Sequence, residues 1–181
     1  MNFINNTIKQ INEIDINSKL KARSKDDPMP SRAAVTSIIK DVQAVLFPAY
    51  FDATVDVDAE AVLYGVYSRL KNEIFMACHF SDKKLSVGCE EAARSFIEEL
   101  PRIKELLLKD IEALYEGDPA AKYRDEVIIC YPGFFAIAVY RMAHVLYNMD
   151  IPLIPRMMTE FAHQKTGIDI HAGAKIGEYF F

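Results

Sequence analysis

The feature that most constrains this fold is a change in the apolar period near the C-terminus. Up to Gly167, apolar side chains recur every three or four residues, which is the spacing of one helix face. Beyond it, Ile170 and Ile176 lie six residues apart, and Gly177 follows directly. Six residues are a multiple of the strand period and too many for one helix turn. The sequence therefore predicts helices followed by short β-strands.

The six-residue period predicts the start of a β solenoid, in which each turn buries its apolar face against the next. A stable array needs about three repeats or more, whereas residues 166–181 hold two hexads and end on Tyr179-Phe180-Phe181. We therefore expect an α-helical domain over residues 1–165 and the incomplete start of a β domain over residues 166–181.

The first region carries the spacing of roughly six to eight helices. Ser31 and Asp58 are placed to cap two of them, because a short polar side chain before a helix accepts a hydrogen bond from a free N–H. Pro101 either kinks one long helix or opens the next, and Gly117 suits the position just past a helix end. The predicted helical stretches are 2–24, 31–46, 58–77, 93–114, 132–149 and 153–165, with an extended link at 51–57 and a linker that could hold a short helical turn at 118–130.

Composition narrows the range of partners. The hydrophobic fraction of 51% is enough for a sizeable core, and the net charge is −5 with scattered lysines and arginines, so we expect no nucleic-acid binding. The longest apolar run, residues 132–146, contains Arg141 and His144. It is also shorter than the ~20 residues of a membrane span, so we expect no membrane insertion.

Cysteine usage indicates a reducing compartment. Cys78, Cys89 and Cys130 lie far apart and form no CxxC pair, so neither a disulfide framework nor a zinc knuckle is indicated. The N-terminus lacks the apolar core of a signal peptide. We therefore expect a cytoplasmic protein with reduced thiols.

No motif for a bound cofactor or metal stands in the sequence. GxGxxG, P-loop and GxSxG patterns are absent, and no pair of His, Asp or Cys has metal-ligand spacing. His79 and His163 each stand alone on a predicted helix. Arg141 and His144 lie three residues apart on one helix face, where they form a polar seam or a contact to the next domain.

Two aspartates are candidate site residues, although each also has a simpler interpretation. Asp118 follows a glycine and precedes a proline, which is typical of a turn. Asp169 lies between two isoleucines, so on an extended strand its side chain points away from theirs and into solvent. His171 shares the face of Asp169 and is a minor candidate for a general base.

Three motifs, in order, resemble the serine O-acetyltransferases, a family of hexapeptide-repeat acyltransferases. The motifs are Asp118-Pro-Ala120, Tyr131-Pro-Gly-Phe-Phe-Ala-Ile-Ala-Val-Tyr-Arg-Met-Ala-His144 and Gly167-Ile-Asp-Ile-His-Ala-Gly-Ala-Lys-Ile-Gly177. The helices before them match the family only in general character. The resemblance implies a mainly all-α fold: a multi-helix N-terminal domain followed by the first strands of a left-handed parallel β-helix.

The resemblance implies transfer of acetyl from acetyl-CoA to the hydroxyl of L-serine, giving O-acetylserine for cysteine biosynthesis. Asp118 matches the aspartate that binds the substrate, and Asp169 matches the aspartate that orients a histidine general base. That histidine would lie beyond Phe181, as would nearly all of the acetyl-CoA surface. We therefore expect acetyl-CoA as a co-substrate, no permanently bound cofactor, and no activity from this chain alone.

The resemblance also implies partners. In the family, helical domains join trimers into hexamers, and cysteine competes at the serine site, where Asp118 would contact it. The enzyme that forms cysteine docks on the family's extreme C-terminus, so we do not expect it to bind here. Two alternatives remain: a hexapeptide acyltransferase with another acceptor, such as a sugar, and a helical oligomerisation module without a catalytic role.

Overall fold

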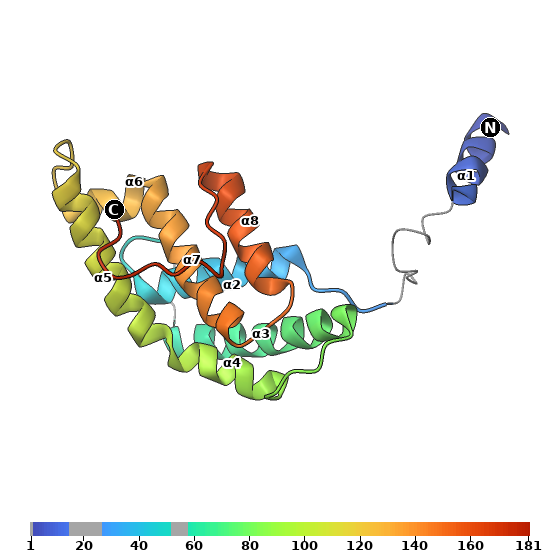
Figure 1. Ribbon diagram of the computed structural model, residues 1–181, viewed down its shortest axis with the longest axis horizontal. Helices are drawn as coiled ribbons and strands as arrows, with labels where there is room; N and C mark the ends of the chain where they lie inside the picture. Colours follow the sequence, from blue (N-terminus) through green and yellow to red (C-terminus); the bar gives the residue numbers. More distant parts are fainter. Residues whose placement is uncertain (1, 15–26, 52–57) are drawn as a thin grey trace.

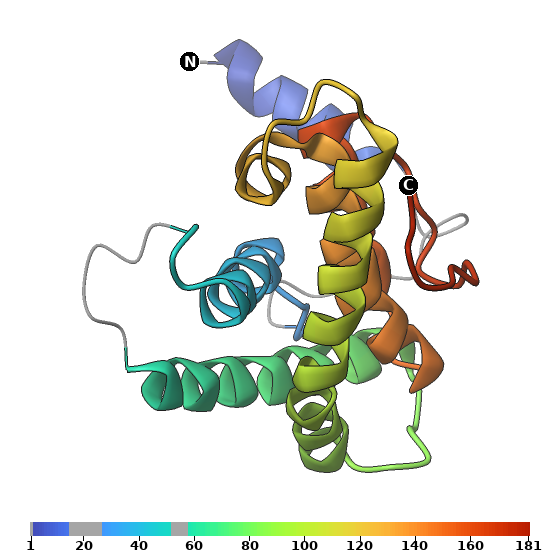
Figure 2. The ribbon, with the colours of Figure 1, turned by 90° about the vertical axis from the view of Figure 1, so that its left-hand side faces the viewer.

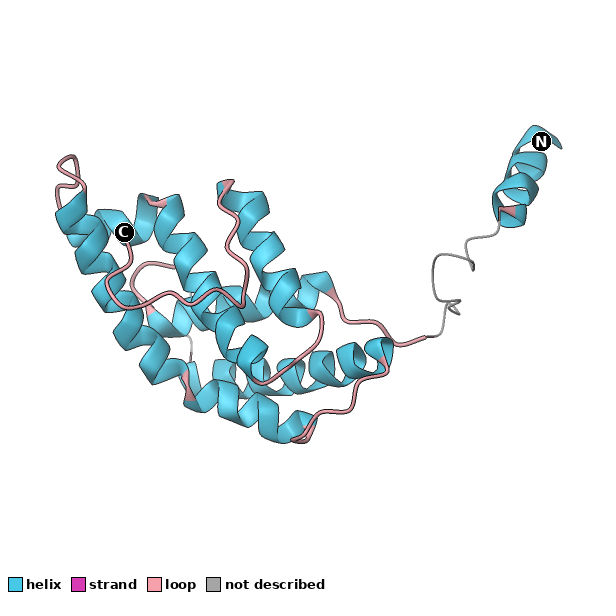
Figure 3. Ribbon diagram, viewed as in Figure 1, coloured by secondary structure: helices cyan, strands magenta, loops and turns pink. Residues whose placement is uncertain are grey.

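The computed structural model describes residues 2–14, 27–51 and 58–181. Within these ranges the chain forms eight α-helices and no β-strand (Figures 1 and 3). The helices are α1 (Asn2–Glu13), α2 (Arg32–Leu46), α3 (Ala59–Ser81), α4 (Cys89–Glu98), α5 (Leu100–Gly117), α6 (Arg124–Cys130), α7 (Pro132–Asn148) and α8 (Ile154–Thr166). The predicted mainly all-α fold is confirmed. Most of the predicted link at 51–57, and the second half of the predicted first helix, lie outside the described residues.

Short polar side chains begin two helices as predicted. At the start of α2, the Ser31 hydroxyl accepts a hydrogen bond from the Ala34 amide at 3.3 Å. At the start of α3, the Asp58 carboxylate accepts one from the Glu60 amide at 3.0 Å. Each bond satisfies an N–H group that has no partner inside its own helix.

The long tract predicted over 93–114 is divided between α4 and α5. Helix α5 begins at Leu100 with Pro101 in its first turn, so the proline opens a helix instead of kinking one. Its missing N–H costs little at that position. Gly117 was predicted to follow the end of this helix, but it is the last residue of α5, so the helix is one residue longer than predicted. The helical turn expected in the linker 118–130 is the seven-residue helix α6.

Helix α7 lies at the centre of the protein. Ten of its 17 residues are buried, and it packs against α4, α5, α6 and α8. Helix α8 turns back alongside α7, while α5 crosses in front of one end of α3 (Figure 2). The apolar run 132–146 is thus the core helix. Among the described residues, no single helix is long and apolar enough to cross a membrane, and α6 with α7 meets that test only as a pair bent by 75°.

Helix α8 ends where the apolar period was predicted to change. Gly167 has a φ of +74°, a left-handed conformation that glycine adopts without steric cost. Residues 168–181, here called the C-terminal segment, then run as an irregular extended stretch across α7 to α5 (Figures 1 and 3). The segment contains no strand, and five of its backbone groups bond to side chains of α5 and α7. The start of a β-helix at this point stays a prediction.

Candidate functional site

Three polar side chains on one face of α7 bind the backbone of the C-terminal segment. We call Tyr140, Arg141 and His144 the α7 seam. The Tyr140 hydroxyl donates to the carbonyl oxygen of Ala174 at 2.6 Å. The His144 Nδ1 lies 2.7 Å from the carbonyl oxygen of Ala172. A carbonyl oxygen only accepts, so Nδ1 carries the proton in this bond.

Arg141 joins α7 both to α5 and to the C-terminal segment. Its Nε and Nη2 donate to the two carboxylate oxygens of Asp110 at 2.5 and 2.6 Å, and Nη2 also donates to the carbonyl of Gly177 at 2.9 Å. Asp110 in turn accepts from the amide of Phe180 at 3.0 Å. The two charged side chains are 4% and 0% exposed. The polar seam on α7 is therefore also a contact to the C-terminal segment, whereas a contact to a complete next domain stays a prediction.

Asp118 closes α5 and holds the turn toward α6. Its Oδ1 accepts from the Ala120 amide at 2.8 Å, and its Oδ2 accepts from the Tyr131 hydroxyl at 2.6 Å. The Tyr131 bond, followed by the Ala120 bond, lowers the pKa of Asp118. The same carboxylate raises the pKa of Tyr131 to about 12. At neutral pH, Asp118 is a half-buried anion held by a neutral phenol.

Sequence reasoning missed the role of Tyr131 as the partner of Asp118. The residue stands directly before the proline that opens α7 and serves as the cap of that helix. The available signal was the Tyr-Pro-Gly sequence, which places Tyr131 at a helix start. Nothing local indicates that this helix start faces the end of α5.

The C-terminal segment reaches the same end of α5. The ring of Phe181 lies against Gly117, where an added Cβ atom would be only 2.6 Å from the ring. A side chain at Gly117 would therefore displace Phe181. The last residue of the segment lies beside the residue that precedes Asp118.

Asp169 and His171 do not form a pair. Asp169 is exposed and makes no hydrogen bond to any residue that the structure describes. The Nδ1 of His171 accepts from the Gly173 amide at 3.0 Å, and its ring lies edge-on to Tyr147 with 5.7 Å between centroids. No bond joins Asp169 to Asp118, and Figure 1 draws the loop after α5 well apart from the end of α8. The catalytic role of Asp169 and the substrate role of Asp118 stay predictions.

The remaining histidines have local surroundings. His79 stacks on Phe75 with 6.5 Å between ring centroids, and His163 lies 4.0 Å from a carboxylate oxygen of Glu160 one turn earlier in α8. In the described ranges, no group of three or more His, Cys, Asp or Glu side chains could hold a metal ion.

Comparison with known proteins finds serine acetyltransferases among the relatives of this chain. No family model matches the chain. A plasmid serine acetyltransferase from Synechococcus elongatus is 36% identical over 170 residues, which cover 85% of this chain and 53% of that protein. A serine acetyltransferase from Mycobacterium tuberculosis is 47% identical over 72 residues, which cover 40% of this chain and 31% of that protein. The chain thus spans about half the length of the first relative and less of the second.

Solved structures give the same result. Serine acetyltransferase isoform 3 of Entamoeba histolytica, in complex with cysteine, matches with a TM-score of 0.70 and 26% identity over 96% of this chain and 59% of its own. Serine acetyltransferase 1 of the same organism, in complex with L-cysteine, matches with a TM-score of 0.67 and 28% identity over 96% of this chain and 62% of its own. By sequence and by fold, this chain is homologous to the serine acetyltransferases.

Proposed function

We propose that this chain is the N-terminal part of a serine O-acetyltransferase, which transfers acetyl from acetyl-CoA to the hydroxyl of L-serine for cysteine biosynthesis. The observation that carries this proposal is the 36% identity over 170 residues with the Synechococcus elongatus enzyme. The C-terminal segment is the start of the left-handed β-helix of hexapeptide repeats. Acetyl-CoA binds there as a co-substrate, and no cofactor is permanently bound.

Asp118 supplies the binding group for the ammonium of serine. Its lowered pKa keeps it charged at neutral pH, and a charge-assisted hydrogen bond to an ammonium is stronger than a neutral one. Tyr131 is a positioning residue, because its hydroxyl holds one carboxylate oxygen in place at 2.6 Å. The turn at Asp118 and the substrate contact are therefore compatible roles of the same side chain.

Asp169 orients the histidine that acts as general base on the serine hydroxyl. A serine hydroxyl is a weak nucleophile at neutral pH, and a positioned base contributes about 10²–10⁴-fold to the rate. The family resemblance places this base outside these 181 residues. The α7 seam holds the segment that carries Asp169.

A chimera tests the proposal directly. Residues 1–181 replace the matching N-terminal part of the Synechococcus elongatus plasmid enzyme, and thiol release from acetyl-CoA is measured with serine. We expect turnover by the chimera and none by the 181-residue polypeptide. Asp118→Asn should raise the KM for serine, whereas Asp169→Asn should lower kcat. A folded chimera without turnover, or Asp118→Asn with an unchanged KM, would contradict the proposal.

Cysteine is the proposed inhibitor at the same site. It shares the ammonium and carboxylate of serine, and two structural relatives were solved in complex with it. In the chimera, Asp118→Asn should therefore weaken inhibition by cysteine together with serine binding. The proposed compartment is the cytoplasm, which matches the three free thiols at Cys78, Cys89 and Cys130.

A second candidate function, oligomerisation, rests on α1. Ile4, Ile8 and Ile11 recur at helical spacing on α1, and each is at least half exposed. An exposed apolar stripe of this kind is typical of a contact surface. We infer that α1 joins copies of this chain, as trimers or hexamers in the intact protein.

Sedimentation velocity tests the role of α1. The unsubstituted chain should associate as its concentration rises, and Ile8→Asp should shift it toward the monomer. Gln10→Asp on the opposite side of α1 is the matched control and should have no effect. A monomer at every concentration would argue against this role.

A further inference from the structure

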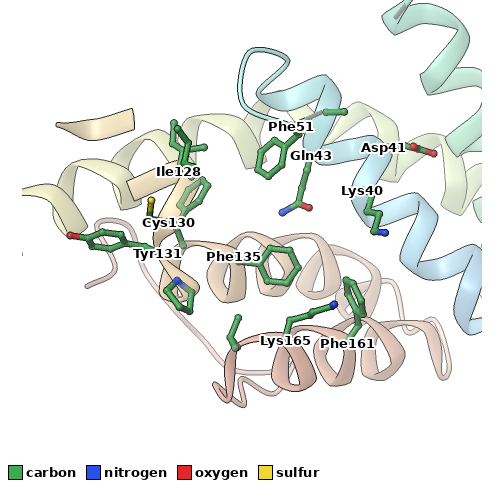
Figure 4. Close-up of a pocket in the computed structure, with 15 residues that line it drawn as sticks. Lys40, Asp41, Gln43, Phe51, Ile128, Cys130, Tyr131, Phe135, Phe161 and Lys165 are labelled. Carbon is green, nitrogen blue, oxygen red and sulfur yellow. The ribbon is translucent and has the colours of Figure 1, made fainter. Parts of the chain in front are cut away.

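A cavity of about 630 Å³ opens between α2, α6, α7 and α8 (Figure 4). Its size lies in the range of about 300–1,000 Å³ typical of small-molecule sites. Five aromatic side chains line it, among them Phe51, Phe135 and Phe161, and the rings of Phe135 and Phe161 lie edge to face with 6.0 Å between centroids. Neither Asp118 nor Asp169 is among its lining residues. Tyr131, the partner of Asp118, does line it, so the cavity adjoins the proposed serine-binding group without containing either aspartate.

One buried polar group in this cavity has no partner. Gln43 is only 4% exposed, yet its amide nitrogen makes no hydrogen bond to any residue that the structure describes. Figure 4 shows its side chain pointing from α2 toward α7 and into the cavity. A buried N–H group without an acceptor costs free energy, which a ligand oxygen at this position would recover.

Two lysines supply positive charge to the cavity. Lys40 on α2 and Lys165 in the last turn of α8 both line it, and neither forms an ion pair within the described ranges. Figure 4 shows the Lys165 side chain lying beside Phe135 and Phe161. The acidic lining residue Asp41 is already paired with Arg69 at 2.5 Å.

We propose that this cavity binds an amphipathic monocarboxylate, that is, a carboxylic acid with an apolar body. The body lies among the rings of Phe51, Phe135 and Phe161, where apolar surface is removed from water. The carboxylate accepts a hydrogen bond from the Gln43 amide and pairs with the ammonium of Lys165. This arrangement satisfies the buried donor and the unpaired cation with a single ligand group.

Isothermal titration calorimetry of the 181-residue chain with octanoate tests the site, with 1-octanol as the uncharged probe of equal chain length. We expect saturable binding of one octanoate per chain. Gln43→Met and Lys165→Ala should each weaken octanoate binding about tenfold, which corresponds to the loss of one charge-assisted hydrogen bond. Octanol should bind more weakly than octanoate to the unsubstituted chain by a similar factor.

Lys84→Ala, an exposed lysine that does not line the cavity, is the matched control and should leave octanoate affinity unchanged. Circular dichroism checks the fold of each variant. If Gln43→Met does not fold, the octanoate affinity of Lys165→Ala alone tests the carboxylate contact. Three results would overturn the proposal: no saturable heat with octanoate, equal affinities for octanol and octanoate, or variant affinities equal to that of Lys84→Ala. None of these readouts depends on acetyl transfer.

Discussion

The guanidinium of Arg141 and the carboxylate of Asp110 form a buried ion pair that also makes hydrogen bonds to the backbone of the C-terminal segment. The two groups are joined by two hydrogen bonds, while Arg141 binds the carbonyl of Gly177 and Asp110 binds the amide of Phe180. One pair therefore connects α5, α7 and the stretch that follows α8. Loss of either charge leaves the other buried and unpaired.

Arg141→Met should lower the free energy of unfolding by about 3–5 kcal/mol, because it leaves the Asp110 carboxylate buried without a counter-charge. Urea unfolding followed by circular dichroism measures the change. Arg156→Ala, which removes an exposed ion pair with Glu160 on α8, is the control and should cost less than about 1 kcal/mol. If both variants lost the same unfolding free energy, the buried Arg141–Asp110 pair would stabilise the fold no more than an exposed ion pair does.

Tyr140→Phe should loosen the C-terminal segment without unfolding the helices. The substitution removes the acceptor of the Ile176 amide at 3.3 Å and the donor to the Ala174 carbonyl. Amide exchange at Ile176 should become roughly 2- to 12-fold faster, the equivalent of 0.5–1.5 kcal/mol. Hydrogen exchange by mass spectrometry measures this change, with Tyr64→Phe, at an exposed tyrosine on α3, as the control. Unchanged protection of the segment would contradict the role of the α7 seam.

Gln43→Met should stabilise the ligand-free chain. The substitution keeps the length of the side chain and removes an amide nitrogen that is buried without a partner, a situation that costs about 1–3 kcal/mol. The midpoint of urea unfolding should therefore rise. Gln164→Met on the exposed side of α8 is the matched control and should change little. A destabilised Gln43→Met variant would indicate that the amide is satisfied.

Tyr131 should keep its proton until the pH approaches 12, because its bond to the Asp118 carboxylate raises its pKa to about 12. The folded pKa lies above the unfolded value of about 10. The stability from this shift is therefore full below pH 10 and is lost as the pH rises toward 12. The tyrosinate absorbance of the unsubstituted chain and of Tyr131→Phe is titrated with pH. The difference between the two curves should show one tyrosine that ionises near pH 12. A difference spectrum that titrates near pH 10 would rule out the bond.

The same bond makes the opposite prediction at acid pH. It lowers the pKa of Asp118, so this contribution to stability is full above the unfolded pKa of about 3.9 and is lost as the pH falls through the folded value. Acid unfolding of Asp118→Asn should therefore show a weaker pH dependence than that of the unsubstituted chain. An identical dependence would mean that Asp118 does not titrate differently in the folded state.

Cys130 should react with iodoacetamide before Cys78. Cys130 is exposed, whereas burial is the main cause that raises the pKa of Cys78 to about 11. The thiolate is the reactive form, so a raised pKa slows alkylation. Peptide mass spectrometry at neutral pH measures the order, and Cys130→Ser should remove the fastest site. Faster modification of Cys78 would contradict its burial.

Helix positions and helix ends could be predicted from the sequence because they depend on nearby residues. Ser31 and Asp58 cap the helices that they precede, Pro101 opens one, and Gly167 ends another. The family resemblance also came from short contiguous motifs. The boundary at Gly117 shifted by one residue, since a helix end frays within a turn and no side chain fixes it more closely.

By itself, then, the sequence determined the all-α fold, the place at which the helical pattern ends, and the two aspartates to examine. The tertiary structure alone decided what those residues touch. In the sequence, Asp110 resembles a surface carboxylate, but in the structure it is buried against Arg141, 31 residues later. Gln43 resembles an exposed helix residue, but in the structure it lines a cavity formed with α6, α7 and α8. Burial and pairing of this kind arise between residues distant in the chain, so no local pattern of spacing or propensity encodes them.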